Sequence, residues 1–122
     1  MKVLALDYGR ARTGVAVSDP TGTIARPLGV VERAATKEGL RRVREIVEKE
    51  QVERVVVGLP LTLRGERGEQ AKETERFVEA LRAALPVPVE LYDERFTSVL
   101  AEGDDARAAA HLLSDYLERA RR

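Results

Sequence analysis

The chain has 122 residues, 43% hydrophobic and 34% charged, so we expect one domain with a single packed core over residues 1–122. It has no cysteine and one histidine, which excludes disulfides, thiolate catalysis, Cys-ligated zinc and multi-His metal centres. Its 21 basic residues balance its 21 acidic ones, so net charge gives no sign of a nucleic-acid partner, and a metal site would need carboxylates, which favour Mg²⁺ or Mn²⁺.

The first third of the chain predicts three strands. Residues 3–7 are an apolar run that ends at an aspartate, too short for a signal peptide, and no run approaches the roughly 20 residues that cross a bilayer. We therefore expect a cytoplasmic protein that makes no membrane contact. A turn at 9–12 leads to a second strand over 13–18, and a third over 23–32 contains Pro27, which predicts an edge position. Together the three predict an antiparallel meander.

Helices and strands alternate in the rest of the chain. Apolar residues at helical spacing predict three long helices: 36–51, 69–85 and 104–121. Apolar, β-branched runs predict two more strands: 54–58 and 87–92. The segments around them predict a loop over 59–68 and a short helix over 97–102. This order predicts an α/β fold with a mixed five-stranded sheet, an antiparallel meander plus parallel strands, and helices on both faces.

Acidic residues stand at the ends of three predicted elements. Asp7 ends the first strand, Asp93 and Glu94 end the fifth, and Asp104 and Asp105 open the last helix. Asp105 precedes three apolar residues of that helix by four, seven and eight positions, which places it on the face that packs against the sheet. Asp104 is the better N-cap. A mixed sheet can bring these two strand ends and one helix start into a single cleft.

Each acid alone has a simpler interpretation. Asp7 could begin a turn, Glu94 could pair with Arg95, and Asp105 could cap or complement the helix dipole. Together they match the needs of phosphodiester hydrolysis, where two Mg²⁺ ions about 3.5–4 Å apart stabilise the attacking water, the leaving oxygen and the charged phosphorus centre. In this interpretation Asp7 bridges the ions, while Glu94 and Asp105 hold one each.

Four groups of residues match a known family in order along nearly the whole chain: Asp7-Tyr8-Gly9 with Arg12 and Gly14, Gly58-Leu59-Pro60-Leu61, Asp93-Glu94-Arg95-Phe96-Thr97-Ser98, and Asp105-x-x-Ala108-Ala109 with Leu113 and Tyr116-Leu117. They resemble the YqgF family, whose members are described as RuvX-like Holliday junction resolvases or as nucleases that process the 5′ end of pre-16S ribosomal RNA. The resemblance implies an RNase H-like fold, a cytoplasmic location and a nuclease that uses Mg²⁺ or Mn²⁺ on structured RNA or branched DNA.

The resemblance also assigns residues. Asp7, Glu94 and Asp105 match the family's three acids, and Arg12 and Arg95 match family arginines that could contact phosphate bidentately. Five arginines lie in turns beside predicted strand ends and could form a phosphate-binding rim, or could be solvated surface charges: Arg10, Arg12, Arg64, Arg67 and Arg95. His111, the single histidine, is expected to be exposed.

Two departures from the family pattern leave alternatives open. Only Gly103 and Asp104 separate Glu102 from Asp105, where members carry a longer and often basic stretch, and Arg64 stands where members often have an acid or amide. A binding or scaffold protein that kept the fold and lost catalysis is therefore an alternative. The oligomeric state is left between a monomer and a weak dimer. Asp7, Gly9 and Gly14 also match the phosphate loop of actin-like and sugar-kinase ATPases. Those enzymes need two such domains around the nucleotide, and 122 residues supply one.

Overall fold

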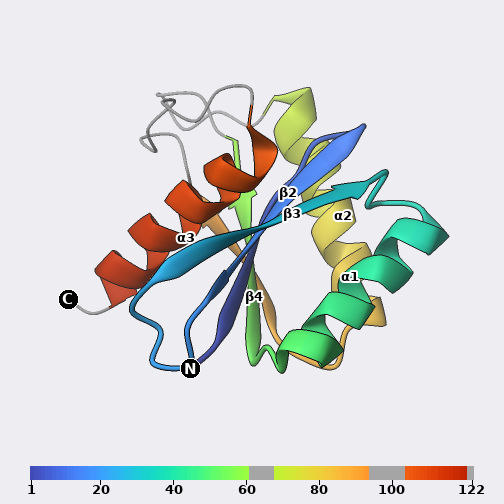
Figure 1. Ribbon diagram of the computed structural model, residues 1–122. Helices are drawn as coiled ribbons and strands as arrows, with labels where there is room; N and C mark the ends of the chain where they lie inside the picture. Colours follow the sequence, from blue (N-terminus) through green and yellow to red (C-terminus); the bar gives the residue numbers. More distant parts are fainter. Residues whose placement is uncertain (61–67, 94–103, 121–122) are drawn as a thin grey trace.

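The structure is a computed structural model that describes residues 1–60, 68–93 and 104–120 (Figure 1). Its elements in chain order are β1 (Val3–Asp7), β2 (Arg12–Ser18), β3 (Ala25–Glu32), α1 (Lys37–Glu50), β4 (Arg54–Leu59), α2 (Glu69–Ala84), β5 (Val89–Asp93) and α3 (Asp105–Ala120). The predicted loop over 59–68 falls largely outside the described residues, and the predicted helix over 97–102 falls wholly outside them. None of the described helices has the length and apolar character needed to span a membrane.

The strands form one mixed sheet in the order β3-β2-β1-β4-β5. β1, β2 and β3 pair antiparallel, while β4 lies parallel to β1 and β5 parallel to β4. This confirms the predicted meander and the mixed five-stranded sheet. Pro27 lies on the edge strand β3, as its missing N–H predicts. The β2–β3 register shifts between Val15 and Ala16, opposite Gly29, whose φ of 154° suits glycine alone.

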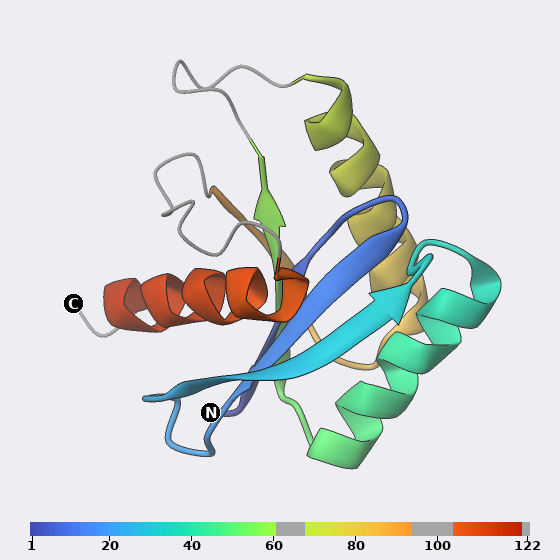
Figure 2. The ribbon, with the colours of Figure 1, turned by 45° about the horizontal axis from the view of Figure 1, so that its top comes forward.

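Helices cover both faces of the sheet. α1 and α2 lie on one face, and α3 crosses the other (Figure 2). Strand alternation sorts the apolar side chains between the two layers, so that Leu4 and Leu6 pack toward α1 and α2, while Val3 and Ala5 pack toward α3. The apolar residues of α3, from Ala109 to Leu117, pack mainly on β1, β2 and β3. The face under α3 therefore belongs to the odd-numbered positions of β1.

Capping residues set the helix ends. The Thr36 side chain accepts a hydrogen bond from the Gly39 N–H at 3.1 Å, and Gln51 takes a left-handed conformation just after α1. Asp104 accepts a hydrogen bond from the Arg107 N–H at 3.1 Å, so it is the N-cap of α3, as predicted. The ranges predicted from periodicity, such as 36–51, include these capping residues, so they exceed the observed helices by one residue at such ends.

Candidate functional site

Asp7 and Asp105 lie on the same face of the sheet. Asp7 is the last residue of β1 and follows Val3 and Ala5 at intervals of two, which directs its side chain toward α3. Asp105 is the first residue of α3, on the helix side that packs against the sheet. The backbone of Asp105 lies against Gly14, which is paired with Asp7 across β1 and β2, so the two acids are neighbours on this face. The structure thus brings together two of the three predicted acids.

Gly14 determines how closely α3 approaches the sheet. It is paired with Asp7 across β1 and β2. A β-carbon built on Gly14 would lie 1.8 Å from the carbonyl oxygen of Asp105 and 2.3 Å from its carbonyl carbon. Only a residue without a side chain leaves room for the first residue of α3 at this point. Sequence reasoning did not assign this role to Gly14, although a lone glycine inside a strand is a sign of close backbone approach.

Among the described residues the two acids share one paired cation, Arg12. Burial, and secondly the negative charge of Asp105, raise the pKa of the Asp7 carboxyl to about 6. Among the described residues no basic group pairs with Asp7, while Asp105 has one partner, the Arg12 guanidinium, whose Nε lies 3.3 Å from Oδ2. A mostly buried carboxylate facing a second carboxylate is an arrangement that a bound cation would stabilise, and oxygen ligands suit Mg²⁺ or Mn²⁺.

The third predicted acid, Glu94, lies outside the described residues. Within residues 1–60, 68–93 and 104–120, no three carboxylate or histidine groups come together in a way that could hold a metal ion. The three-carboxylate centre therefore stays a prediction. Strand alternation indicates which acid at the end of β5 belongs to this centre. Because Tyr92 of β5 packs on the α3 face, the side chain of the next residue, Asp93, is directed to the opposite face.

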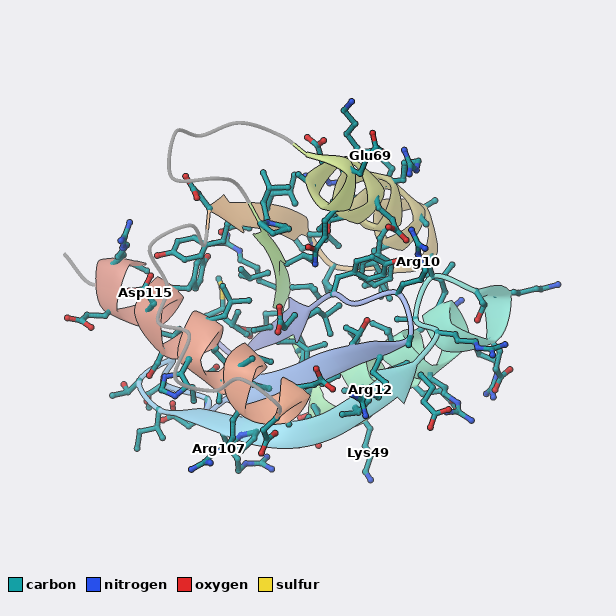
Figure 3. All side chains as sticks on the ribbon, turned by 90° about the horizontal axis from the view of Figure 1, so that it is seen from above. Arg10, Arg12, Lys49, Glu69, Arg107 and Asp115 are labelled. Atoms are coloured by element: carbon teal, nitrogen blue, oxygen red, sulfur yellow. The ribbon has the colours of Figure 1, made fainter. Side chains whose placement is uncertain are left out.

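Two of the predicted rim arginines are described, and both pair with acids. Arg10 donates from Nε and Nη2 to the two carboxylate oxygens of Glu73 in α2, at 3.0 and 3.1 Å. Arg12 pairs with Asp105, with its Nε 3.3 Å from Oδ2. Figure 3 shows Arg10 beside α2 and Arg12 by the first turn of α3. Arg64, Arg67 and Arg95 lie outside the described residues, so their place at the rim stays a prediction.

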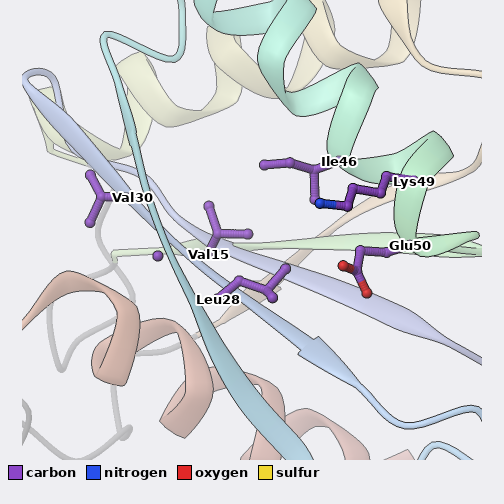
Figure 4. A pocket seen from close by; sticks show the side chains of 7 residues that line it. Val15, Leu28, Val30, Ile46, Lys49 and Glu50 are labelled. Atoms are coloured by element: carbon purple, nitrogen blue, oxygen red, sulfur yellow. The ribbon is translucent and has the colours of Figure 1, made fainter.

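Neighbouring features have structural roles. A β-carbon on Gly9 would lie 2.4 Å from the Arg12 carbonyl oxygen, so the tight β1–β2 turn accounts for this glycine. His111 is exposed on α3, as predicted. A pocket of about 210 Å³ lies between β3 and α1, where Leu28 and Ile46 contribute to its lining (Figure 4). Neither Asp7 nor Asp105 lines it, so the candidate site is distinct from this pocket.

Known proteins similar in sequence cover almost the whole chain. The family described as "RuvX: Holliday junction resolvase" matches residues 1–119. A protein of Chloroflexus aurantiacus named "Putative pre-16S rRNA nuclease" is 43% identical over 131 residues, which cover 95% of this chain and 86% of that protein. A protein of the same name from Syntrophomonas wolfei is 38% identical over 133 residues, covering 97% and 94%. Both aligned stretches exceed this chain's 122 residues, so each relative has residues without a counterpart here.

Solved structures show the same fold. The Thermus thermophilus RuvC structure superposes with a TM-score of 0.62 at 20% identity and covers 99% of this chain and 96% of RuvC. The fowlpox virus Holliday junction resolvase superposes with a TM-score of 0.56 at 14% identity, covering 98% and 99%. These likenesses confirm the predicted RNase H-like fold. Because the family match spans residues 1–119 and the relatives exceed one third identity over most of their length, the chain belongs to the RuvX family.

Proposed function

We propose that the chain is a metal-dependent nuclease that hydrolyses phosphodiester bonds as a single domain. The observation that carries this proposal is the placement of Asp7 and Asp105 on one face of the sheet, where Arg12 is the one cation paired with either of them among the described residues. Glu94 is the proposed third carboxylate, and Mg²⁺ or Mn²⁺ the proposed ions, since the three ligands are all oxygen donors. Names given to the relatives, which describe them as nucleases, support the same reaction.

The proposed roles follow from the position of each side chain. When bound, the metal ions would neutralise charge at the phosphate and lower the pKa of the attacking water. Asp7 is mostly buried, so its ionised form needs a cation beside it. Asp105 stands at the N-terminus of α3, where the helix dipole stabilises a negative charge. Gly14 keeps that helix start against β2, so that Asp105 stays on the same face as Asp7.

The proposed substrate is structured RNA, with 5′-end processing of pre-16S rRNA in the cytoplasm as the biological reaction. The names of the relatives from Chloroflexus and Syntrophomonas support this choice. Branched DNA is the second candidate, because the family is described as a Holliday junction resolvase. A scaffold protein without catalysis is the third candidate. It is favoured by the aligned stretch of the relatives, which is longer than this chain, as expected if the segment before Asp105 is shortened here.

A cleavage assay with both substrates tests the proposal. A pre-16S rRNA fragment and a four-way DNA junction are incubated side by side with Mn²⁺, Mg²⁺ or EDTA. The wild-type chain is expected to cut the RNA with metal and not in EDTA, and Asp7→Asn and Asp105→Asn are expected to cut neither. Asp104→Asn keeps a good N-cap and serves as the matched control. Cleavage of the junction alone would support the resolvase, and Mn²⁺ binding without cleavage of either substrate would support the scaffold.

A further inference from the structure

The two described rim arginines differ in how firmly they are held. Arg10 makes a bidentate contact with Glu73, and the Tyr8 hydroxyl also donates to the same carboxylate at 3.4 Å. The ring of Tyr8 is in turn stacked on Phe77 of α2 at a centroid distance of 4.5 Å. Two parallel N–H···O bonds to an anchored acid make a strong and specific pair. Arg10 therefore ties the β1–β2 turn to α2 through two hydrogen bonds, although its side chain is 85% exposed.

The pair between Arg12 and Asp105 is weaker. Nε of Arg12 lies 3.3 Å from Oδ2 of Asp105, but the pair makes no hydrogen bond of good geometry, and the Arg12 side chain is 66% exposed. Among the described residues Arg12 has no second acidic partner, and its guanidinium makes no hydrogen bond to another residue. A single exposed contact of this kind contributes little to stability and breaks easily. The guanidinium therefore lies beside Asp105 but can leave it at little cost in free energy.

Strand alternation explains why Arg12 reaches this place. Arg12, Gly14 and Ala16 occupy alternate positions of β2, and Ala16 packs in the layer under α3. Gly14 lets α3 begin directly on the strand, which brings the Asp105 carboxylate within reach of the arginine two positions away. Arg12 is thus built into the same face as the two acids, whereas Arg10 turns away toward α2 (Figure 3).

We propose that Arg12 is a substrate-positioning residue that becomes available when a divalent cation replaces it at Asp105. This inference rests on the proposed function of the site. In the metal-free protein Arg12 partly neutralises Asp105; a cation bound by Asp105 and Asp7 takes over that role and repels the guanidinium. Arg12 then turns its bidentate donor edge to a phosphate of the nucleic acid. Metal and nucleic acid therefore bind with positive coupling through this side chain.

The coupling predicts opposite effects of Arg12 on the two ligands. Because Arg12 competes with the metal, its removal makes Mn²⁺ bind more tightly in the absence of nucleic acid. Because Arg12 contacts phosphate only after its release, its removal lowers the salt dependence of nucleic-acid binding only when metal is present. A residue that merely braces Asp105 would do the reverse: its loss would weaken Mn²⁺ binding and leave the salt dependence unchanged.

The first measurement is Mn²⁺ affinity by isothermal titration calorimetry, without nucleic acid. Arg12→Ala is expected to bind Mn²⁺ about two- to fivefold more tightly than wild type, the range that loss of a weak exposed ion pair allows. Arg12→Lys keeps the charge and is expected to stay close to wild type. Arg10→Ala is the control, because its partner is Glu73, and is expected to leave Mn²⁺ affinity unchanged. Weaker Mn²⁺ binding by Arg12→Ala would overturn the proposal.

The second measurement is the salt slope of binding to a four-way junction and to an RNA hairpin, in EDTA and in Ca²⁺. On the ligand that binds, the slopes of wild type and Arg12→Ala are expected to agree in EDTA and to differ by about one unit in Ca²⁺. A difference of equal size in both buffers would show that Arg12 contacts phosphate without release by metal, and would overturn the coupling. Arg12→Lys is expected to restore the slope, since it too neutralises a phosphate.

Failure of this inference can be told apart from failure of the proposed function. If wild type binds no Mn²⁺, or if Asp7→Asn and Asp105→Asn bind it as well as wild type, then the metal site is wrong and the Arg12 proposal falls with it. If Mn²⁺ binding needs both acids but is weakened or unchanged by Arg12→Ala, only the Arg12 proposal fails. Thermal melting of each variant in EDTA confirms that the variants are folded.

Discussion

The carbonyl oxygen of Asp105 occupies the place next to Gly14 that a side chain would need, 1.8 Å from an ideal β-carbon on that glycine. Gly14 is in turn paired with Asp7 across β2 and β1. One glycine thus sets the position of one candidate metal ligand relative to the other. The contact is between backbone atoms, so it cannot be relieved by turning a side chain.

Gly14→Ala is predicted to move the first turn of α3 away from the sheet. The extra methyl group should lower the free energy of unfolding by about 1–3 kcal/mol or more, as overpacking in a core does. It should also weaken Mn²⁺ binding, because it displaces Asp105. Chemical denaturation and calorimetry measure the two effects. Gly68→Ala is the matched control, since a β-carbon there meets nothing within 4 Å. Mn²⁺ binding by Gly14→Ala at wild-type affinity would refute the positioning role of this glycine.

Asp7→Asn is predicted to stabilise the metal-free protein at neutral pH. The pKa of Asp7 is raised from 3.8 to about 6, so between these values the folded state holds the proton more tightly and stability falls as pH rises. Above pH 6 the ionised group should therefore lower stability by at most about 3 kcal/mol, which the neutral amide recovers. Denaturation in EDTA at pH 7 and pH 3.5 should show a gain at the first pH only. An equal gain at both pH values would contradict the argument.

Mn²⁺ is predicted to raise the melting temperature of the wild-type chain. At 100 times its dissociation constant, a ligand that binds only the folded state stabilises it by about 2.7 kcal/mol. Asp7→Asn and Asp105→Asn should lose most of this gain, because each removes a charged ligand, and Asp104→Asn should keep it. Melting curves with and without Mn²⁺ check this directly. A shift of the same size in all four proteins would place the metal elsewhere on the surface.

The acids of each neighbouring pair are predicted to differ in importance. Glu94→Gln should reduce cleavage far more than Asp93→Asn, because alternation along β5 directs Asp93 away from the α3 face. Asp105→Asn should reduce cleavage more than Asp104→Ala, whose main effect should be about 1 kcal/mol of lost capping. Cleavage rates and unfolding free energies separate the two effects. If Asp93 and Asp104 proved essential instead, the assumed register would be wrong by one residue at both places.

Much of the fold could be predicted because each signal is local. A β-branched run, an apolar stripe or a proline within a strand is read from a few neighbouring residues, so the strands at 3–7 and 54–58 and the edge position of β3 follow from the sequence. Capping chemistry is equally local, and it correctly distinguished Asp104 from Asp105. Helical spacing likewise placed Asp105 on the face toward the sheet.

The partners within the site were decided only by the tertiary structure. Whether Arg12 contacts Asp105 depends on the path of α3 across the sheet. Whether Arg10 contacts Glu73 depends on the path of α2, since Glu73 is 63 residues further along the chain. No local pattern encodes such distances. The sequence by itself determined which residue types stand at which element ends. Packing of α3 onto Gly14 determined that two of those ends meet, because Gly14 has no side chain to stand between the helix backbone and the strand.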